Sequence, residues 1–380
     1  MTSSAAKVLP LVLATMTSQA LLVVLAPTVV AVGAELGTTV GAAGQARSVT
    51  AAVSVAVSLL LGTRPGLLSV RRLLVAGSVL AVLASGAVAA AGSTATFLAA
   101  HVLVGLAFAL LLSGGFAGLA AFDADRRPWA TGYVAGSNAL AWILVTPAAG
   151  VLTEAWSWRA AEALPAALAV AALVAAPAAR PAPSARAGAA LAPLRVGVAR
   201  RWIVAEVAGY AAWTSLLTFA GAFFVQRLGV RESLAGWLLA GGAGAYLLAS
   251  VRSGRLSRRV PRRRLVATAA LIMAVLLPMM LAVARSAPVA VALFCLLGLA
   301  AGIRTPVSAS LGLDQLPAQP AAMMTARTGA TQTGYLVGAV VGGAVISGAG
   351  YPALGLVLAV VMATSAALVL GVDDPEPPRP

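Results

Sequence analysis

The chain has 380 residues, of which 61% are hydrophobic and only 10% are charged, and its formal net charge is +15. In a water-soluble domain about a quarter of the residues are normally charged, so this composition excludes a water-soluble protein. The basic residues gather in short clusters between long apolar runs and are not interleaved with aromatic side chains, which argues against a nucleic-acid partner. The sequence therefore predicts an integral membrane protein.

Twelve apolar runs are long enough to cross a bilayer, which takes roughly 20 residues of helix. A membrane β-barrel would show alternating segments of about ten residues, so these longer runs predict helices. The expected spans, in chain order, are 8–32, 44–62, 73–91, 96–118, 129–152, 160–178, 203–226, 233–251, 265–284, 288–312, 328–348 and 351–371.

The basic residues predict the orientation of these spans. With the N-terminus in the cytoplasm, 20 of the 26 Lys and Arg residues fall in cytoplasmic segments, Arg327 among them. Two fall within spans, Arg47 and Arg304. Four fall in outer loops, Arg159, Arg227, Arg231 and Arg285. Cytoplasmic loops carry an excess of cations, so we expect a multi-pass protein of the cell membrane with both termini in the cytoplasm.

An internal repeat divides the chain. "GTRPGLLSVRRL" (62–73) recurs 192 residues later as "GRLSRRVPRRRL" (254–265), and the same offset pairs "ELG" (35–37) with "RLG" (227–229). We therefore expect two six-helix bundles in parallel topology, 1–178 and 202–371, with a cytoplasmic tail at 372–380. The segment 179–201, rich in Pro, Ala and Arg, is the expected cytoplasmic linker.

The arginine-rich loop at 254–265 has two interpretations. It anchors the topology against anionic lipid, or it gates the inner face together with its repeat. The residues that a gating role would involve are Gly62, Arg71, Arg72, Gly254 and Arg262, with a side chain at Gly254 expected to hinder close helix packing.

In its six-plus-six helices and these loops the chain resembles the major facilitator superfamily, although Gly66 and Arg258 stand where that family has Asp. His101 and Gly105 in "HVLVGLAFAL" stand at the positions of the family's Arg-x-x-x-Gly segment. Span five (Pro147, Gly150) and the Ser-Trp-Arg at 157–159 are similar to those of bacterial drug:proton antiporters and arabinose-efflux-permease-like exporters. The resemblance implies an all-α fold of twelve transmembrane helices in two six-helix pseudo-repeats, with spans one, four, seven and ten lining a central cavity.

Ionisable residues inside spans are the main site candidates, because a charge at the bilayer centre costs at least about 2.5–3.5 kcal/mol. They are Arg47, His101, Glu162, Glu206 and Arg304. The resemblance places Glu206 and Arg304 on cavity-lining helices at similar depth, where they are expected to face each other; Glu206 snorkelling to the headgroups is the alternative. His101 titrates near about pH 6.5 when unperturbed and is the rival proton carrier, or else a packed, hydrogen-bonded side chain.

Neutral residues complete the predicted site. Thr15 and Gln19 on span one, and Tyr210 and Trp213 on span seven, lie near the predicted membrane centre and are expected to contact substrate. Small residues let helices approach closely, and a proline allows bending. Such packing or gating positions are Pro147, Gly150, Gly334 and Gly338.

No metal-ligand spacing, nucleotide-binding loop or catalytic triad is evident, so the sequence predicts neither an enzyme nor a cofactor. A secondary transporter is expected: proton-coupled export of a small amphipathic or apolar molecule by alternating access. Its partners would be that substrate, neutral or anionic rather than a multivalent cation, together with protons and membrane lipid, and a monomer is expected. An importer or uniporter of a metabolite or sugar, and a non-transporting membrane sensor, are the alternatives.

The cation distribution makes a topological prediction. Protease added to intact cells should leave the 179–201 linker uncut, whereas protease added to inverted membrane vesicles should cleave there, as detected by immunoblotting tags at both ends. Cleavage from outside intact cells would overturn the twelve-span topology.

Overall fold

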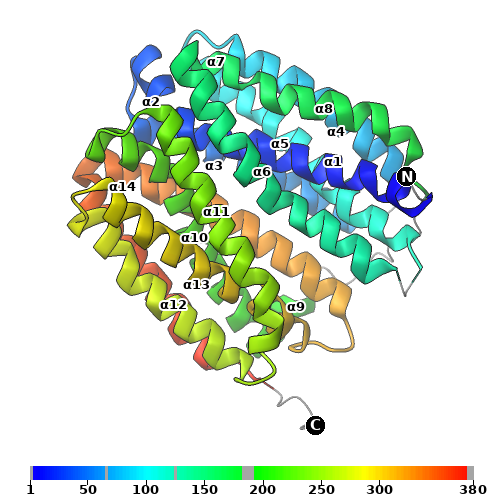
Figure 1. The fold of residues 1–380 in the computed structure, drawn as a ribbon. Coiled ribbons are helices and arrows are strands. Elements are labelled where there is room, and N and C mark those ends of the chain that lie inside the picture. Colours follow the sequence, from blue (N-terminus) through cyan, green and yellow to red (C-terminus); the bar gives the residue numbers. More distant parts are fainter. Residues whose placement is uncertain (1–2, 65–66, 124–125, 182–191, 375–380) are drawn as a thin grey trace. The chain divides into compact units, whose positions relative to one another are not determined.

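The computed structural model describes residues 3–64, 67–123, 126–181 and 192–374, and within these ranges every regular element is a helix (Figure 1). Within these ranges, eleven helical segments are long and apolar enough to cross a membrane. Parts of the expected linker (182–191) and tail (375–380) lie outside the described residues.

The first half of the chain supplies six candidate spans. Their elements are α1 (Ser3–Val23) with α2 (Leu25–Glu35), α3 (Val40–Thr63), α4 (Val70–Ala89), α5 (Thr94–Ala117) with η1 (Gly118–Ala121), α6 (Arg127–Ala155), and α7 (Trp158–Ala161) with α8 (Ala163–Ala175) and η2 (Ala176–Ala178).

The second half supplies the other five. After the short α9 (Ala192–Arg195) they are α10 (Gly197–Ala222) with η3 (Phe223–Arg227), α11 (Glu232–Leu256), α12 (Arg262–Pro278) with η4 (Met279–Val283), α13 (Ala287–Leu313) and α14 (Pro320–Leu370).

The last of these segments is two spans joined at a break. Continuous helix over the 49 residues Ala322–Leu370 would measure about 74 Å, more than twice the ~30 Å hydrocarbon core. Gly350 interrupts it with φ 75° and ψ −175°, a conformation that L side chains rarely adopt. The break separates the expected spans 328–348 and 351–371, so the structure agrees with twelve crossings.

Helix boundaries follow the 192-residue repeat. α11 and α12 begin at 232 and 262, and α3 and α4 begin at 40 and 70. Gly37 and Gly229, the glycines of "ELG" and "RLG", take φ values of 63° and 66°, a left-handed conformation common just beyond a helix end. The two halves therefore use the same turns at equivalent positions.

The chain forms two compact units: 1–187 with 220–240, and 188–219 with 241–380. The expected bundle boundaries at 178 and 202 stay a prediction. In the first unit α4 packs against α5 and α8, and α1 packs against α5 and α6. Glu35 of "ELG" accepts a 2.6 Å hydrogen bond from Trp158 Nε1 and pairs with Arg159, which links the end of α2 to α7.

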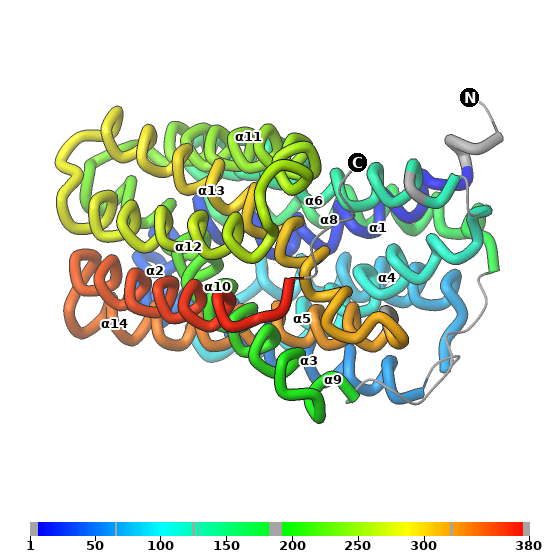
Figure 2. Tube along the Cα trace, turned by 90° about the horizontal axis from the view of Figure 1, so that it is seen from below, coloured from blue at the N-terminus to red at the C-terminus, as the bar shows by residue number. Residues whose placement is uncertain are grey.

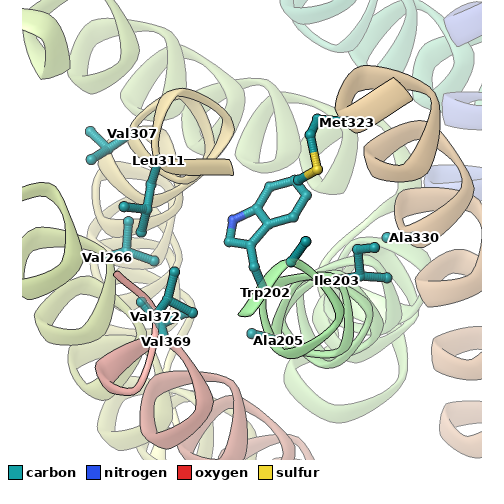
Figure 3. Close-up of a cluster of buried hydrophobic side chains, with 11 residues drawn as sticks. Trp202, Ile203, Ala205, Val266, Val307, Leu311, Met323, Ala330, Val369 and Val372 are labelled. Atoms are coloured by element: carbon teal, nitrogen blue, oxygen red, sulfur yellow. The ribbon is translucent and has the colours of Figure 1, made fainter. Parts of the chain in front are cut away.

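The second unit has an apolar core around Trp202 of α10, whose indole is 1% exposed. Side chains from α12, α13 and α14 surround it (Figure 3): Val266, Val307, Leu311, Met323, Ala330 and Val369. α12 packs along both α13 and α14, as Figure 2 also shows. The Trp202 core thus lies about one helical turn along α10 from Glu206.

The glycines of α14 permit close helix contact, as the sequence indicates. A Cβ on Gly334 would meet Cβ of Tyr210 at 2.6 Å, and one on Gly338 would meet the backbone oxygen of Ala211. In the first unit, a Cβ on Gly150 would meet the carbonyl of Glu232. The expectation for Gly254 is wrong in this structure, because a Cβ there meets no atom within 4 Å.

Gly338→Ala should lower the free energy of unfolding by about 1–3 kcal/mol, because the added methyl group must displace backbone of α10 rather than a flexible side chain. Gly329→Ala is the matched control, since it lies on the same helix with nothing within 4 Å of its Cβ position. Thermal unfolding of the two purified variants checks this, and equal midpoints would contradict the close contact.

Candidate substrate and coupling site

Glu206 and Arg304 form a buried ion pair in the second unit. Arg304 Nη2 lies 3.0 Å from Glu206 Oε1, and the two side chains are 3% and 0% exposed. The expectation that these residues face each other is confirmed, and at 0% exposure Glu206 does not snorkel. The functional role of the pair stays a prediction.

Small side chains and hydroxyl groups hold this pair in place. A Cβ on Gly209, one turn after Glu206, would collide with the Arg304 guanidinium, so glycine leaves the space that the arginine occupies. Arg304 Nη2 donates to Ser365 Oγ at 3.1 Å, and Ser308 Oγ donates to Glu206 Oε1 at 2.9 Å. These bonds offset part of the cost of removing both charges from water.

Trp202 connects the pair to the apolar core. Its indole Nε1 donates to the carbonyl oxygen of Ser308 at 3.1 Å and lies 3.2 Å from Ser308 Oγ, the hydroxyl that binds Glu206. A Cβ on Gly312 would collide with the same indole. The indole is therefore held between α10 and α13. It orients Ser308, and Ser308 in turn orients the carboxylate of Glu206.

Arg327 is the third member of the cluster, and it is not among the site residues that the sequence predicts. The cation pattern predicts a cytoplasmic segment here, and the structure shows that Arg327 lies within α14, which begins at Pro320. Its Nε lies 3.7 Å from Glu206 Oε2, with a side chain 19% exposed. The signal was the run "PAAMMTA" at 320–326, which extends the helix about two turns before Arg327.

Aromatic side chains surround Arg327. Its Nη2 donates to the Tyr210 hydroxyl at 2.8 Å, and its guanidinium lies 5.9 Å from the centre of that ring. Tyr246 and Tyr335 also lie within electrostatic reach of Arg327. Trp213 stacks on Tyr246 with ring centres 6.4 Å apart. Tyr210 and Trp213, expected from the sequence, therefore lie in or next to the charged cluster.

The first-half candidates make contacts of other kinds within their own unit. Thr15 hydrogen-bonds Ser137 at 2.5 Å, an α1–α6 contact, and Gln19 is buried at 8% exposure. His101 Nδ1 lies 2.8 Å from the carbonyl oxygen of Phe97, one turn earlier on the same helix. This bond fits the packed interpretation of His101, and buried Arg47 acts on it electrostatically.

Glu162, the remaining ionisable candidate, lies between α7 and α8 with 9% exposure. Among the described residues, no group of three or more His, Cys, Asp or Glu side chains is placed to hold a metal ion.

The loop arginines divide into exposed and tethered residues. Arg71 and Arg72 are exposed at the start of α4, and Gly62 lies near the end of α3. Arg262 instead lies 2.6 Å from Asp314 and 3.2 Å from Asp374, which ties α12 to the end of α13 and to the C-terminal segment. Asp374 also accepts a 2.8 Å hydrogen bond from the backbone N–H of Arg263, capping a helix that starts after Pro261.

Arg262→Gln should lower the free energy of unfolding by about 1–2 kcal/mol, because Asp374 is nearly buried and loses its charge partner. The effect is smaller than for a fully buried pair since Asp314 is 40% exposed. Arg264→Gln removes an exposed charge from the same loop and should leave the unfolding midpoint unchanged. Equal losses of stability or of membrane insertion in both variants would favour the lipid-anchor interpretation.

Comparisons with known proteins now identify the fold. Residues 202–380 match the family model of the Major Facilitator Superfamily. A crystal structure of a mutant of the nucleoside transporter NupG superposes with a TM-score of 0.74 at 12% identity, covering 95% of this chain and 98% of that one. No curated protein matches the sequence. The chain therefore has the major facilitator fold, and its second half matches the model of that superfamily.

Proposed function

We propose that this protein is a proton-coupled secondary transporter working by alternating access, with Glu206 as the proton carrier and Arg304 as its counter-ion. The observation that supports this assignment is a fully buried carboxylate held between two guanidinium groups on different helices. Intramembrane ionisable residues are costly and mark ion or substrate pathways by default.

Protonation of Glu206 would act as a switch on helix packing. With Glu206 ionised, α10, α13 and α14 are joined by the charge contacts of one carboxylate. Adding a proton removes its attraction for both arginines and leaves two cations facing each other, which destabilises this arrangement relative to others. A gradient of protons can then shift the equilibrium between conformations.

Export of a small amphipathic or apolar molecule in exchange for protons, in the cell membrane with both termini cytoplasmic and as a monomer, stays the expectation from the sequence. Uptake is the second candidate, and it is favoured by the two arginines that face one carboxylate in the cluster, because an anionic substrate there would bind together with a proton. A nucleoside is a substrate class to test, because a nucleoside transporter shares this fold.

Glu206→Gln should abolish proton flux evoked by substrate, because glutamine cannot carry the proton. Proteoliposomes containing a pH indicator, exposed in turn to ethidium, uridine and benzoate between about pH 5.5 and 8, measure this against protein-free vesicles. Arg200→Gln, an exposed charge on the same helix, is the control expected to keep the flux.

The variant His101→Ala tests whether His101, rather than Glu206, carries the proton. It should keep substrate-evoked proton flux, since His101 is bonded within its own helix. Flux that survives in Glu206→Gln and vanishes in His101→Ala would move the proton site to α5. Transport of a probe without any proton flux would contradict proton coupling, and transport of none of the three would favour the sensor alternative.

A further inference from the structure

The buried cluster has more positive than negative charge. Two guanidinium groups, those of Arg304 and Arg327, face one carboxylate, that of Glu206. Among the described residues, no other carboxylate lies within 4 Å of either arginine's nitrogens. With Glu206 ionised the cluster therefore carries one net positive charge inside the membrane-spanning part of the protein, which is an expensive arrangement without an anion.

Arg327 is the cation of the cluster that a ligand can reach. Its Nε is buried and has no hydrogen-bond acceptor, and the nearest carboxylate oxygen, Glu206 Oε2, lies 3.7 Å away and has no hydrogen-bond donor. The Nε of Arg304 also lacks an acceptor, but that side chain is bonded to Glu206 and Ser365 and is only 3% exposed. The Arg327 side chain as a whole is 19% exposed, so a part of it other than Nε is accessible to a ligand.

We propose that Arg327 binds the transported substrate, and that the substrate is a small organic monoanion with a flat aromatic or amphipathic body. This inference rests on the proposed function and gives its substrate class. A guanidinium group offers paired N–H donors that match a carboxylate, and one anion cancels the one excess charge of the cluster.

The side chains next to Arg327 fit the body of such a molecule. Tyr210 lies against the guanidinium, Tyr335 lies 6.3 Å from Tyr210 between ring centres, and Trp213 and Tyr246 form a stacked pair. These rings come from α10, α11 and α14 and are buried or half-buried. Aromatic faces bind flat rings, while their hydroxyl groups supply hydrogen bonds to polar substituents.

An anion at Arg327 would couple its own binding to that of a proton. Adding a proton alone would give the cluster a charge of about +2, and adding the anion alone would give about zero, whereas adding both restores the +1 of the empty site. The anion therefore favours protonation of Glu206, and by linkage the proton favours the anion to the same extent. Substrate and proton would travel together in the same direction, which favours uptake driven by an inward proton gradient over export by exchange.

Glu206 is the titrating group in this scheme, and its charged and titratable neighbours come from several helices. They are Arg304 on α13, Arg327 and Tyr335 on α14, Tyr210 on α10 and Tyr246 on α11. α12 contributes the apolar side chain of Val266 to the adjoining core. Arg262 and Arg263, at the start of α12, bind Asp374 instead. Among these named neighbours, which are arginines and tyrosines, Glu206 is the one carboxylate.

The test compares benzoate with benzamide, which has the same shape and no charge, on the purified full-length protein at constant ionic strength. Binding is followed by the shift of the thermal midpoint and by tryptophan fluorescence. We expect benzoate to bind at least about tenfold more tightly than benzamide. In weakly buffered solution, binding should take up about one proton per benzoate at a pH where empty Glu206 is ionised.

Four variants assign these effects to residues. Arg327→Gln should abolish the preference for benzoate, and Arg327→Lys should keep only part of it, because Lys lacks the planar fork. Glu206→Gln should still bind benzoate but take up no proton. Arg200→Gln should behave as the wild type.

Equal binding of benzoate and benzamide, no binding of benzoate, or a preference that persists in Arg327→Gln would overturn the anion site. If the anion site fails while proton flux evoked by uridine or ethidium still requires Glu206, only this inference falls and the proposed function stands. If benzoate requires Arg327 but its binding takes up no proton, the coupling of anion to proton is overturned.

Discussion

A single buried carboxylate constrains the second unit of this protein. Glu206 has no access to solvent, so its charge must be balanced by groups from neighbouring helices, and α13 and α14 each supply an arginine. Gly209 gives Arg304 its space, and Ser308 and Ser365 supply further hydrogen bonds. The members of this charge network come from three helices, α10, α13 and α14, so the network links the packing of these helices.

The two halves share a helix pattern but not this chemistry. At the 192-residue offset, Glu206, Arg304 and Arg327 correspond to Ala14, Leu112 and Ala135. In the first unit, α1 and α6 are joined instead by the hydroxyl groups of Thr15 and Ser137. Among the described residues, the repeated scaffold thus carries this buried Glu206 cluster in one copy, consistent with the principle that function lives in side chains placed on a fold.

The arginine-rich loop shows how a repeat compensates for a lost residue. Ser69 caps α4 with its own hydroxyl, whereas its counterpart Pro261 has no side chain that can cap α12. Asp374, from the far end of the chain, accepts the N–H of Arg263 and pairs with Arg262. Arg262 pairs with both Asp314 and Asp374, so it has a structural role besides any attraction to lipid.

Composition, hydrophobic length and cation distribution determined the membrane class and the span count, and the repeat predicted two six-helix halves, because these depend on local sequence alone. The prediction that Glu206 and Arg304 face each other needed only their depths in the membrane and the helix order of the family that the chain resembles. The sequence did not reveal Arg327, the serines or Tyr335, and it misjudged Gly254. Which face a helix turns to its neighbours, and where a helix begins beyond its most apolar stretch, are decided by packing among several helices, and only the tertiary structure contains that information.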